Sequence, residues 1–154
     1  MRLANRQRGV AFVELAISAF VLMTIAFGIT EFGRAIYQYN ELAKAARDAA
    51  RFLSTRDPTD TTAKAQAKCL VVYGRPACTG TPLVAGLTLA HVSVCDALDC
   101  PADHANQGTA PVVNLVTVSI GGANATQYLF DSVVSFIVPD FTFSPISVTM
   151  RQVL

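Results

Sequence analysis

One apolar segment near the amino terminus constrains this chain more than any other feature. Residues Val10 to Ile29 form a run of twenty residues, of which sixteen are apolar and one, Glu14, is charged. As an α-helix at about 1.5 Å per residue, the run would be about 30 Å long, which matches the hydrocarbon core of a bilayer. The chain is 52% apolar and only 15% charged, whereas a soluble domain has about 25% charged residues. We therefore predict one membrane-spanning helix.

The flanks of this segment predict its orientation. Arg2, Arg6 and Arg8 precede it, and 125 residues follow it. Because cytoplasmic flanks carry an excess of Lys and Arg, we expect the amino terminus in the cytoplasm and the bulk of the chain outside. A secretory signal peptide is the alternative, with Ala26 to Gly28 loosely similar to a cleavage site. The apolar core of such a signal has about 7 to 15 residues, and this run is longer.

Glu14 is the unusual residue of the span. An acidic residue near the centre of a membrane helix costs about 2.5 to 3.5 kcal/mol on insertion scales, so such residues usually mark a function. The alternative is that Glu14 reaches back to the cytoplasmic interface, because it lies only five residues into the span. Position alone favours this alternative, whereas the neighbouring residues favour a functional role for Glu14.

The residues before Glu14 resemble a processing site. The sequence RQRG at residues 6–9 is followed by four apolar residues and then Glu14, which is similar to the prepilin peptidase site of type IV pilins. This resemblance implies cleavage between Gly9 and Val10 and, in many family members, N-methylation of the new amino terminus. A carboxylate at the fifth mature position could then meet the amine of a neighbouring subunit in a low dielectric and select the register of assembly.

The chain beyond the span continues with helical spacing. Its apolar stripe consists of Phe32, Ile36, Tyr39, Ala43, Ala46, Ala50 and Leu53. We expect one helix from Val10 to Leu53, bent at Gly28 and Gly33, with Asp57-Pro58 ending it because the residue before proline leaves the helical region. We interpret the stripe as a packing face for the protein's own head. A coiled coil with a partner is less favoured, because the spacing persists for barely three heptads.

Charged residues on the same helix are spaced for local ion pairs. Glu41 and Lys44 are three residues apart, and Lys44 and Asp48 are four apart. Such neighbours support a helix surface by about 0.2 to 0.5 kcal/mol per pair. Each of the two pairs can therefore give modest support to the surface of this helix.

The extension also sharpens the family resemblance. FGITEFGR at residues 27–34 and AARDAAR at residues 45–51 look like the TadE-like family of the tight-adherence, or Flp, pilus system. ISVTMRQVL at residues 146–154 more faintly resembles the closing strand of that family. Leu15 stands where the major pilins of that system have a tyrosine, which favours a minor pilin or pseudopilin. The resemblance implies as partners other pilin or pseudopilin subunits, the prepilin peptidase and the inner-membrane pilus assembly platform.

The rest of the chain predicts an α+β head. Asp60 is expected to cap a helix through Val72 that stops at Gly74. The strand signals are Leu87 to Val94, Val112 to Ile120 and Ile146 to Leu154. Leu129 to Ile137, closed by Pro139, fits a short amphipathic helix, although a strand is open for so short an apolar run.

These segments predict a type IV pilin-like organisation of the α+β class. It comprises a cytoplasmic leader at 1–9, a transmembrane helix at 10–29, a helix extension at 30–57 and an extracytoplasmic α+β head at 58–154. The long helix is expected to pack on a small antiparallel sheet. The expected location is the bacterial inner membrane in a single pass, with a periplasmic carboxy-terminal domain and incorporation in an extracellular pilus as an option.

Four cysteines lie in the part expected outside the cytoplasm: Cys69, Cys78, Cys95 and Cys100. An oxidising compartment predicts disulfides, with three possible pairings. We favour Cys69 with Cys78 and Cys95 with Cys100, because each pair closes a short loop with turn-forming residues.

Metal binding is the competing interpretation of this region. His91, Cys95, Cys100 and His104 could form a zinc site, but the usual two-residue spacing between cysteines is missing. Asp96, Asp99 and Asp103 could hold calcium, but the glycine turn and terminal glutamate of an EF-hand loop are missing. We therefore predict no metal and no cofactor.

The remaining sequence patterns narrow the function. A net charge of +1 implies no nucleic-acid partner, and the absence of GxSxG, HExxH and phosphate-binding glycine loops predicts no catalytic residues. The leading hypothesis is a processed minor pilin or pseudopilin that takes part in assembly or initiation of a tight-adherence pilus. The alternative is an unprocessed single-span anchor for a binding or scaffold domain of an envelope secretion complex. A type II secretion pseudopilin is a third option, although Val10 stands where such proteins normally have phenylalanine.

Overall fold

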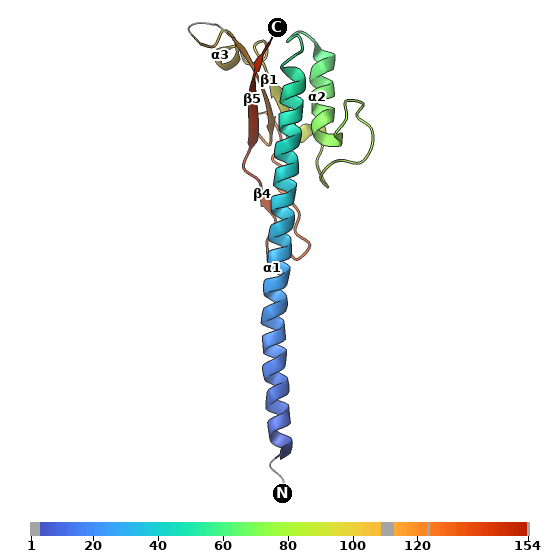
Figure 1. Cartoon of the computed structure of the whole chain (residues 1–154), viewed down its shortest axis with the longest axis vertical. Coiled ribbons are helices and arrows are strands. Elements are labelled where there is room, and N and C mark those ends of the chain that lie inside the picture. The colour runs from blue at the N-terminus through green and yellow to red at the C-terminus, as the bar shows by residue number, and fades with distance from the viewer. Residues whose placement is uncertain (1–3, 109–112, 123, 154) are drawn as a thin grey trace. The chain divides into compact units, whose positions relative to one another are not determined.

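The computed structural model describes residues 4–108, 113–122 and 124–153, with side chains from Gly9 onward. Its elements are α1 (Ala4–Leu53), α2 (Thr61–Tyr73), the 3-10 helix η1 (Leu89–His91), β1 (Val92–Cys95), α3 (Pro101–His104), β2 (Asn114–Ile120), β3 (Leu129–Phe130), β4 (Phe141–Thr142) and β5 (Ile146–Gln152). Figure 1 shows the long α1 and the small group of strands. A long amino-terminal helix with a small antiparallel sheet confirms the predicted α+β class.

The chain divides into two compact units. The first unit comprises Met1–Ile36 and Asp131–Asp140, and the second comprises Tyr37–Phe130 and Phe141–Leu154. Helix α1 therefore contributes its amino-terminal part to the first unit and residues 37–53 to the second.

Helix α1 is uninterrupted over 50 residues. The bend expected at Gly28 and Gly33 does not appear as a break, since both lie within continuous helix. Within the apolar segment and directly after it, the hydroxyls of Thr24 and Thr30 donate hydrogen bonds to backbone carbonyls four residues earlier. These bonds satisfy the two polar side chains without a partner from another element, as an apolar surrounding requires.

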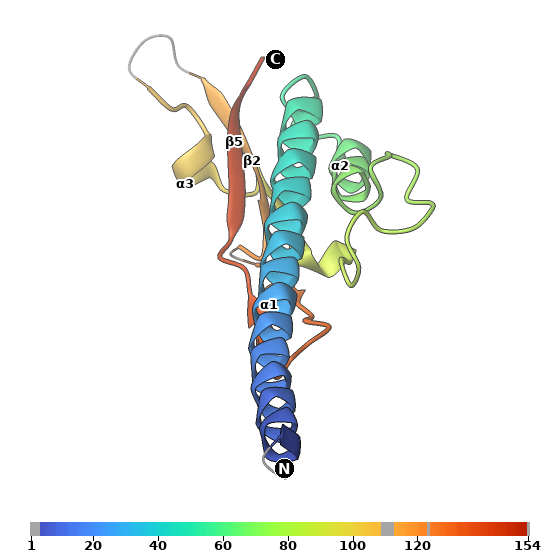
Figure 2. The ribbon, with the colours of Figure 1, turned by 60° about the horizontal axis from the view of Figure 1, so that its bottom comes forward.

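The second unit is built around small residues of α1. Leu42, Ala45, Ala46, Ala49, Ala50 and Leu53 are buried in one core with residues from α2 and the sheet. In both ribbon views, this part of α1 runs between α2 and β5 (Figures 1 and 2). Alanine lets neighbouring elements approach a helix closely, so a buried run of alanines suits a helix covered on two sides.

The predicted stripe was partly wrong. Three of its seven residues are buried as expected: Ala46, Ala50 and Leu53. Ala43 is only half-buried, and the other three are exposed: Phe32, Ile36 and Tyr39. The predicted stripe assumed that α1 packs against a single element. Helix α2 and the sheet together bury a wider arc of α1 than one stripe covers.

Helix α2 follows its predicted signals closely. The Asp60 carboxylate accepts the backbone N–H of Ala63 at 3.0 Å, and the Gly74 N–H donates to the carbonyl of Leu70. Gly74 has φ of 69°, the left-handed conformation that favours glycine at this position. The predicted caps are therefore confirmed.

The three-stranded sheet has the order β1-β2-β5 and is antiparallel throughout. Val116, Val118 and Ile120 of β2 are buried on one face, and Val112, the first residue of the predicted strand, lies outside the described residues. The strand expected from Leu87 begins only at Val92, because residues 89–91 form η1.

The predicted short helix at 129–137 was wrong. Leu129 and Phe130 instead pair with Thr142 and Phe141 as strands β3 and β4. Phe130 is fully buried, and its ring packs 5.1 Å from that of Phe141. This aromatic packing favours the extended backbone over the helical spacing of the local sequence.

Candidate processing and assembly site

The predicted processing residues lie in the first turns of α1 that have described side chains. Gly9, Val10 and Glu14 are all helical and exposed. Val10, Glu14 and Ile17 are spaced by four and three residues, so they share one face of the helix. At about 1.5 Å per residue, Glu14 lies about 6 Å along the axis from Val10. The carboxylate thus stands one turn from the proposed new amino terminus.

The local fold gives no reason for a glycine at position 9. A Cβ added there would have no atom within 4 Å apart from its own chain neighbours and helix backbone. Its φ is also not positive, so neither packing nor conformation requires glycine. A requirement for glycine would therefore have to come from another molecule.

Glu14 has no ion-pair partner within the described residues. The ion pairs found there join Glu31 to Arg34, and Lys64 to Asp96 and Asp99. Glu14 is instead surrounded along α1 by exposed apolar side chains. Its carboxylate is available to a partner.

The segment that contains these residues suits a membrane. Helix Gly9–Leu53 has a mean hydropathy of 2.3 in its most apolar 18-residue window, and no residue of that window is buried in the molecule. It is the one described helix long and apolar enough to cross a bilayer. The large exposed side chains of this region are what a lipid or subunit environment would cover.

A polar cluster lies just beyond the apolar run. Arg34 Nη2 donates to the carboxylate of Glu31 at 2.8 Å and to the backbone carbonyl of Asp131 at 2.5 Å. Glu31 is buried. The two residues are three apart on α1, but the contact with Asp131 spans 97 positions. No sequence pattern signalled that contact.

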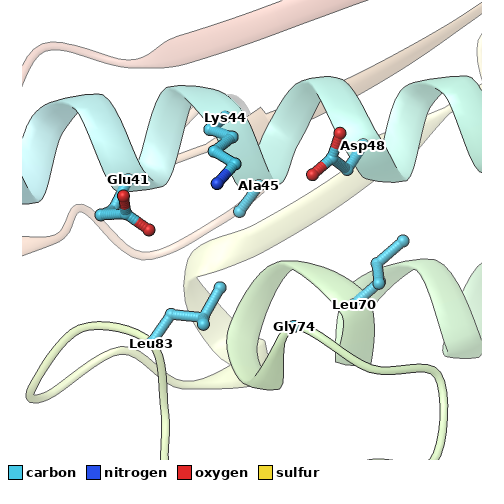
Figure 3. Close-up of a pocket in the computed structure, with 7 residues that line it drawn as sticks. All are labelled: Glu41, Lys44, Ala45, Asp48, Leu70, Gly74 and Leu83. Atoms are coloured by element: carbon cyan, nitrogen blue, oxygen red, sulfur yellow. The ribbon is translucent and has the colours of Figure 1, made fainter.

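A separate groove lies in the second unit between α1 and α2 (Figure 3). Its volume is about 220 Å³, and it is lined by Glu41, Lys44, Ala45, Asp48, Leu70, Gly74 and Leu83. The three charged side chains stand in a row on α1, and Leu70 and Leu83 lie opposite. Their spacing allows Lys44 to pair with Glu41 or Asp48, but neither pair is among the ion pairs of the described residues.

The four cysteines are joined within the second unit. Cys69 is bonded to Cys78, and Cys95 to Cys100. The first disulfide holds the loop after α2 to that helix, and the second closes the loop after β1.

An ion-pair network holds the Cys95–Cys100 loop. Lys64 Nζ lies 2.7 Å from a carboxylate oxygen of both Asp96 and Asp99. The second oxygen of Asp96 accepts the backbone N–H groups of Leu98 and Asp99. Burial opposes the charged forms, but the mutual attraction outweighs it and raises the pKa of Lys64. The pKa of Asp96 is lowered for the same reason, with the two N–H groups adding to the effect. No spacing pattern predicts this network, because Lys64 and Asp99 are 35 positions apart.

The alternative metal sites do not assemble within the described residues. Cys95, Cys100 and His104 have their ligand atoms within 4.8 Å of one another, but the two sulfurs are joined in a disulfide and supply no thiolate. His91 is absent from this group, and its Nδ1 accepts the N–H of Thr88. The candidate calcium ligands Asp96 and Asp99 already hold the ammonium of Lys64.

These features define a class of protein: an exposed apolar amino-terminal helix, suited to a membrane anchor, that continues into a disulfide-bonded α+β head. Within that class, the family described as TadE-like protein matches residues 9–51. This confirms the family resemblance over α1 and points to a pilin-like protein associated with a tight-adherence pilus. The match covers 43 of 154 residues and begins at Gly9. Neither a curated protein nor a solved structure matches the chain.

Proposed function

We propose that this protein is a minor pilin or pseudopilin, cleaved between Gly9 and Val10 by a prepilin peptidase, that takes part in assembly or initiation of a tight-adherence pilus. The observation that carries the proposal is the setting of Glu14. It is a carboxylate without an ion-pair partner in the described chain, on an exposed apolar helix that lies within the TadE-like match.

Gly9 supports the cleavage step. A glycine that no contact or backbone conformation of this fold requires is consistent with recognition by a peptidase that accepts only a very small side chain. The arginines before it would keep the leader at the cytoplasmic face, where such a peptidase acts. Cleavage would convert the amide nitrogen of Val10 into a positively charged amine.

Glu14 supports the assembly step. Between helices packed in an apolar environment, an isolated carboxylate is expensive, whereas a carboxylate paired with an amine recovers much of that cost. The amine on Val10 of a neighbouring subunit is a suitable partner, because both groups lie near the start of the same exposed helix face. Pairing of the two would fix the axial register between subunits.

The partners and location follow from the same mechanism. The partners are other pilin or pseudopilin subunits, the prepilin peptidase and the inner-membrane assembly platform. The chain is placed in the inner membrane in a single pass, with the head in the periplasm. From there the mature protein can enter a pilus.

Glu14→Leu tests the assembly step, and Thr24→Leu is its matched control. Both changes make the same span more apolar, but only the first removes a carboxylate. The control loses one hydroxyl that bonds to its own helix. At equal protein levels, we expect Glu14→Leu to reduce the number of pili on cells strongly and Thr24→Leu to leave it near wild type. Normal piliation with Glu14→Leu would favour the unprocessed anchor of a binding or scaffold domain instead.

A further inference from the structure

Residues 131–140 form an apolar loop that belongs to the same compact unit as the amino-terminal part of α1. The loop reads DSVVSFIVPD, with a charge only at each end. Val133 is 76% exposed and Phe136 is 79% exposed, so two large apolar side chains project from its tip. Such a patch on a short loop indicates a surface that another molecule covers.

The loop lies against α1 at the end of the apolar run. A Cβ at Gly28 would lie 3.8 Å from a methyl group of Ile137, and Gly28 is the penultimate residue of the run from Val10 to Ile29. Arg34 holds the start of the loop through its bond to the carbonyl of Asp131. Two contacts, one apolar and one polar, therefore fix the loop along the helix.

The loop is closed across its base. The N–H of Ser132 donates to the carboxylate of Asp140 at 2.8 Å. Within the tip, the N–H groups of Ile137 and Val138 both donate to the carbonyl of Val134. These bonds make the tip a compact turn rather than an extended strap.

We propose that the tip of this loop, carried by Val133 and Phe136, inserts its side chains into the outer leaflet of the membrane that α1 crosses. The inference rests on the membrane span of the proposed function. If residues 10–29 fill the hydrocarbon core, Gly28 lies at its outer boundary, and the loop beside Gly28 lies at the same depth. The apolar side chains at the tip would then meet the same lipid as the exposed apolar side chains of the helix.

The polar groups of the loop limit how deeply it enters. Unpaired backbone groups do not enter hydrocarbon without a large cost, and Asp131 and Asp140 are charged. The side chains at the tip can reach the boundary between headgroups and acyl chains while the base stays in the headgroup region, as in interfacial anchors. A second contact of this kind would restrict rotation and tilt of α1 in the bilayer.

The chain contains no tryptophan, so a single introduced tryptophan reports its own environment. We would reconstitute the full chain in phosphatidylcholine vesicles with Phe136→Trp and, as a second tip position, Val133→Trp. Phe20→Trp in the span is the positive control, and Leu98→Trp, at an exposed leucine of the Cys95–Cys100 loop, is the negative control. Fluorescence would be compared in ordinary vesicles and in vesicles with brominated acyl chains.

We expect both tip variants and Phe20→Trp to show blue-shifted emission and a large loss of intensity with brominated lipid, and Leu98→Trp to show neither. Quenching in the span but not at the tip overturns the inference and leaves the span intact. Blue-shifted tip emission without quenching also overturns it, because protein and not lipid would then cover the tip. Equal quenching of Leu98→Trp would indicate general adsorption of the head, which contradicts a role specific to the loop. Absence of quenching with Phe20→Trp would contradict the membrane span and therefore also the inference that rests on it.

Discussion

Replacement of Lys64 by methionine should destabilise the second unit, because Asp96 would lose its counter-ion while remaining buried. Asp96 is only 2% exposed, and Lys64 is 18% exposed. The ammonium and the carboxylate are 2.7 Å apart. Methionine keeps most of the apolar stem of lysine, so the change removes mainly the charge.

The expected loss of stability depends on the hydrogen bonds that Asp96 retains in the variant. Breaking a fully buried ion pair by removing one partner costs about 3 to 5 kcal/mol. Here the carboxylate retains two backbone N–H donors, from Leu98 and Asp99, and Lys64 is partly reached by water. We therefore expect a loss of about 2 kcal/mol, within the range for a hydrogen bond to a charged group.

Asp99→Asn is the matched control, because it removes the other partner of the same lysine. Asp99 is 51% exposed, and exposed ion pairs contribute about 0 to 1 kcal/mol. The assay is urea unfolding of the full chain in detergent micelles with the disulfides intact, followed by near-ultraviolet circular dichroism of the tyrosines. A loss for Lys64→Met no larger than that for Asp99→Asn would refute the reasoning.

The same network predicts a pH dependence. The pKa of Asp96 is lower in the folded protein than its ordinary value of 3.8, so its stabilisation is present above that value and is lost as pH falls through the folded pKa. The pKa of Lys64 is higher than its ordinary value of 10.5, so its contribution is present below 10.5 and is lost as pH rises through the folded pKa. The difference between wild type and Lys64→Met should therefore be constant at neutral pH and shrink in strong acid and strong base. A difference that already disappears near neutral pH would contradict the assigned pKa directions.

Three further changes can be measured by the same urea assay. Gly74→Ala should lower the free energy of unfolding by about 1 kcal/mol or more, because φ of Gly74 is positive and the new Cβ would lie 3.1 Å from a methyl group of Leu83. Ala49→Leu should cost about 1 to 3 kcal/mol by overpacking, because Ala49 is fully buried in the core; an unchanged stability would contradict the close packing of α1. Serine at both Cys69 and Cys78 should cost about 2 to 3 kcal/mol, and non-reducing peptide mapping of wild type should recover these two cysteines in one linked pair.

Local signals predicted the parts of this fold that local physics determines. The caps of α2 depend on residues within a few positions of each other, such as Asp60 with the N–H of Ala63. The buried face of β2 depends on strict alternation, which Val116 and Val118 show clearly. The length of α1 was predictable because no proline interrupts its helical spacing.

Signals that depend on tertiary packing were misread. The spacing of residues 129–137 fits a helix, but Leu129 and Phe130 form a strand, because Phe130 is buried beside Phe141. Similarly, the stripe on α1 was drawn for one packing partner, and the fold supplies two.

Sequence-distant contacts could not be predicted from one chain. Lys64 meets Asp96 and Asp99, and Arg34 meets the carbonyl of Asp131, without any spacing pattern that relates them. The candidate site at Gly9 and Glu14 is the opposite case. It is local, so the sequence alone suggested it, and the structure adds that no packing contact explains the glycine.

The intact mass of the membrane-extracted protein tests the central claim most directly. Cleavage between Gly9 and Val10 predicts a mass that is lower than that of the full chain by the mass of residues 1–9. Methylation of Val10 would add a small increase, and formation of two disulfides would remove the mass of the hydrogen atoms lost from the four thiols. Replacement of Gly9 by a bulky residue should restore the leader to the measured mass. A wild-type protein that retains residues 1–9 in a cell with an active prepilin peptidase would contradict the account.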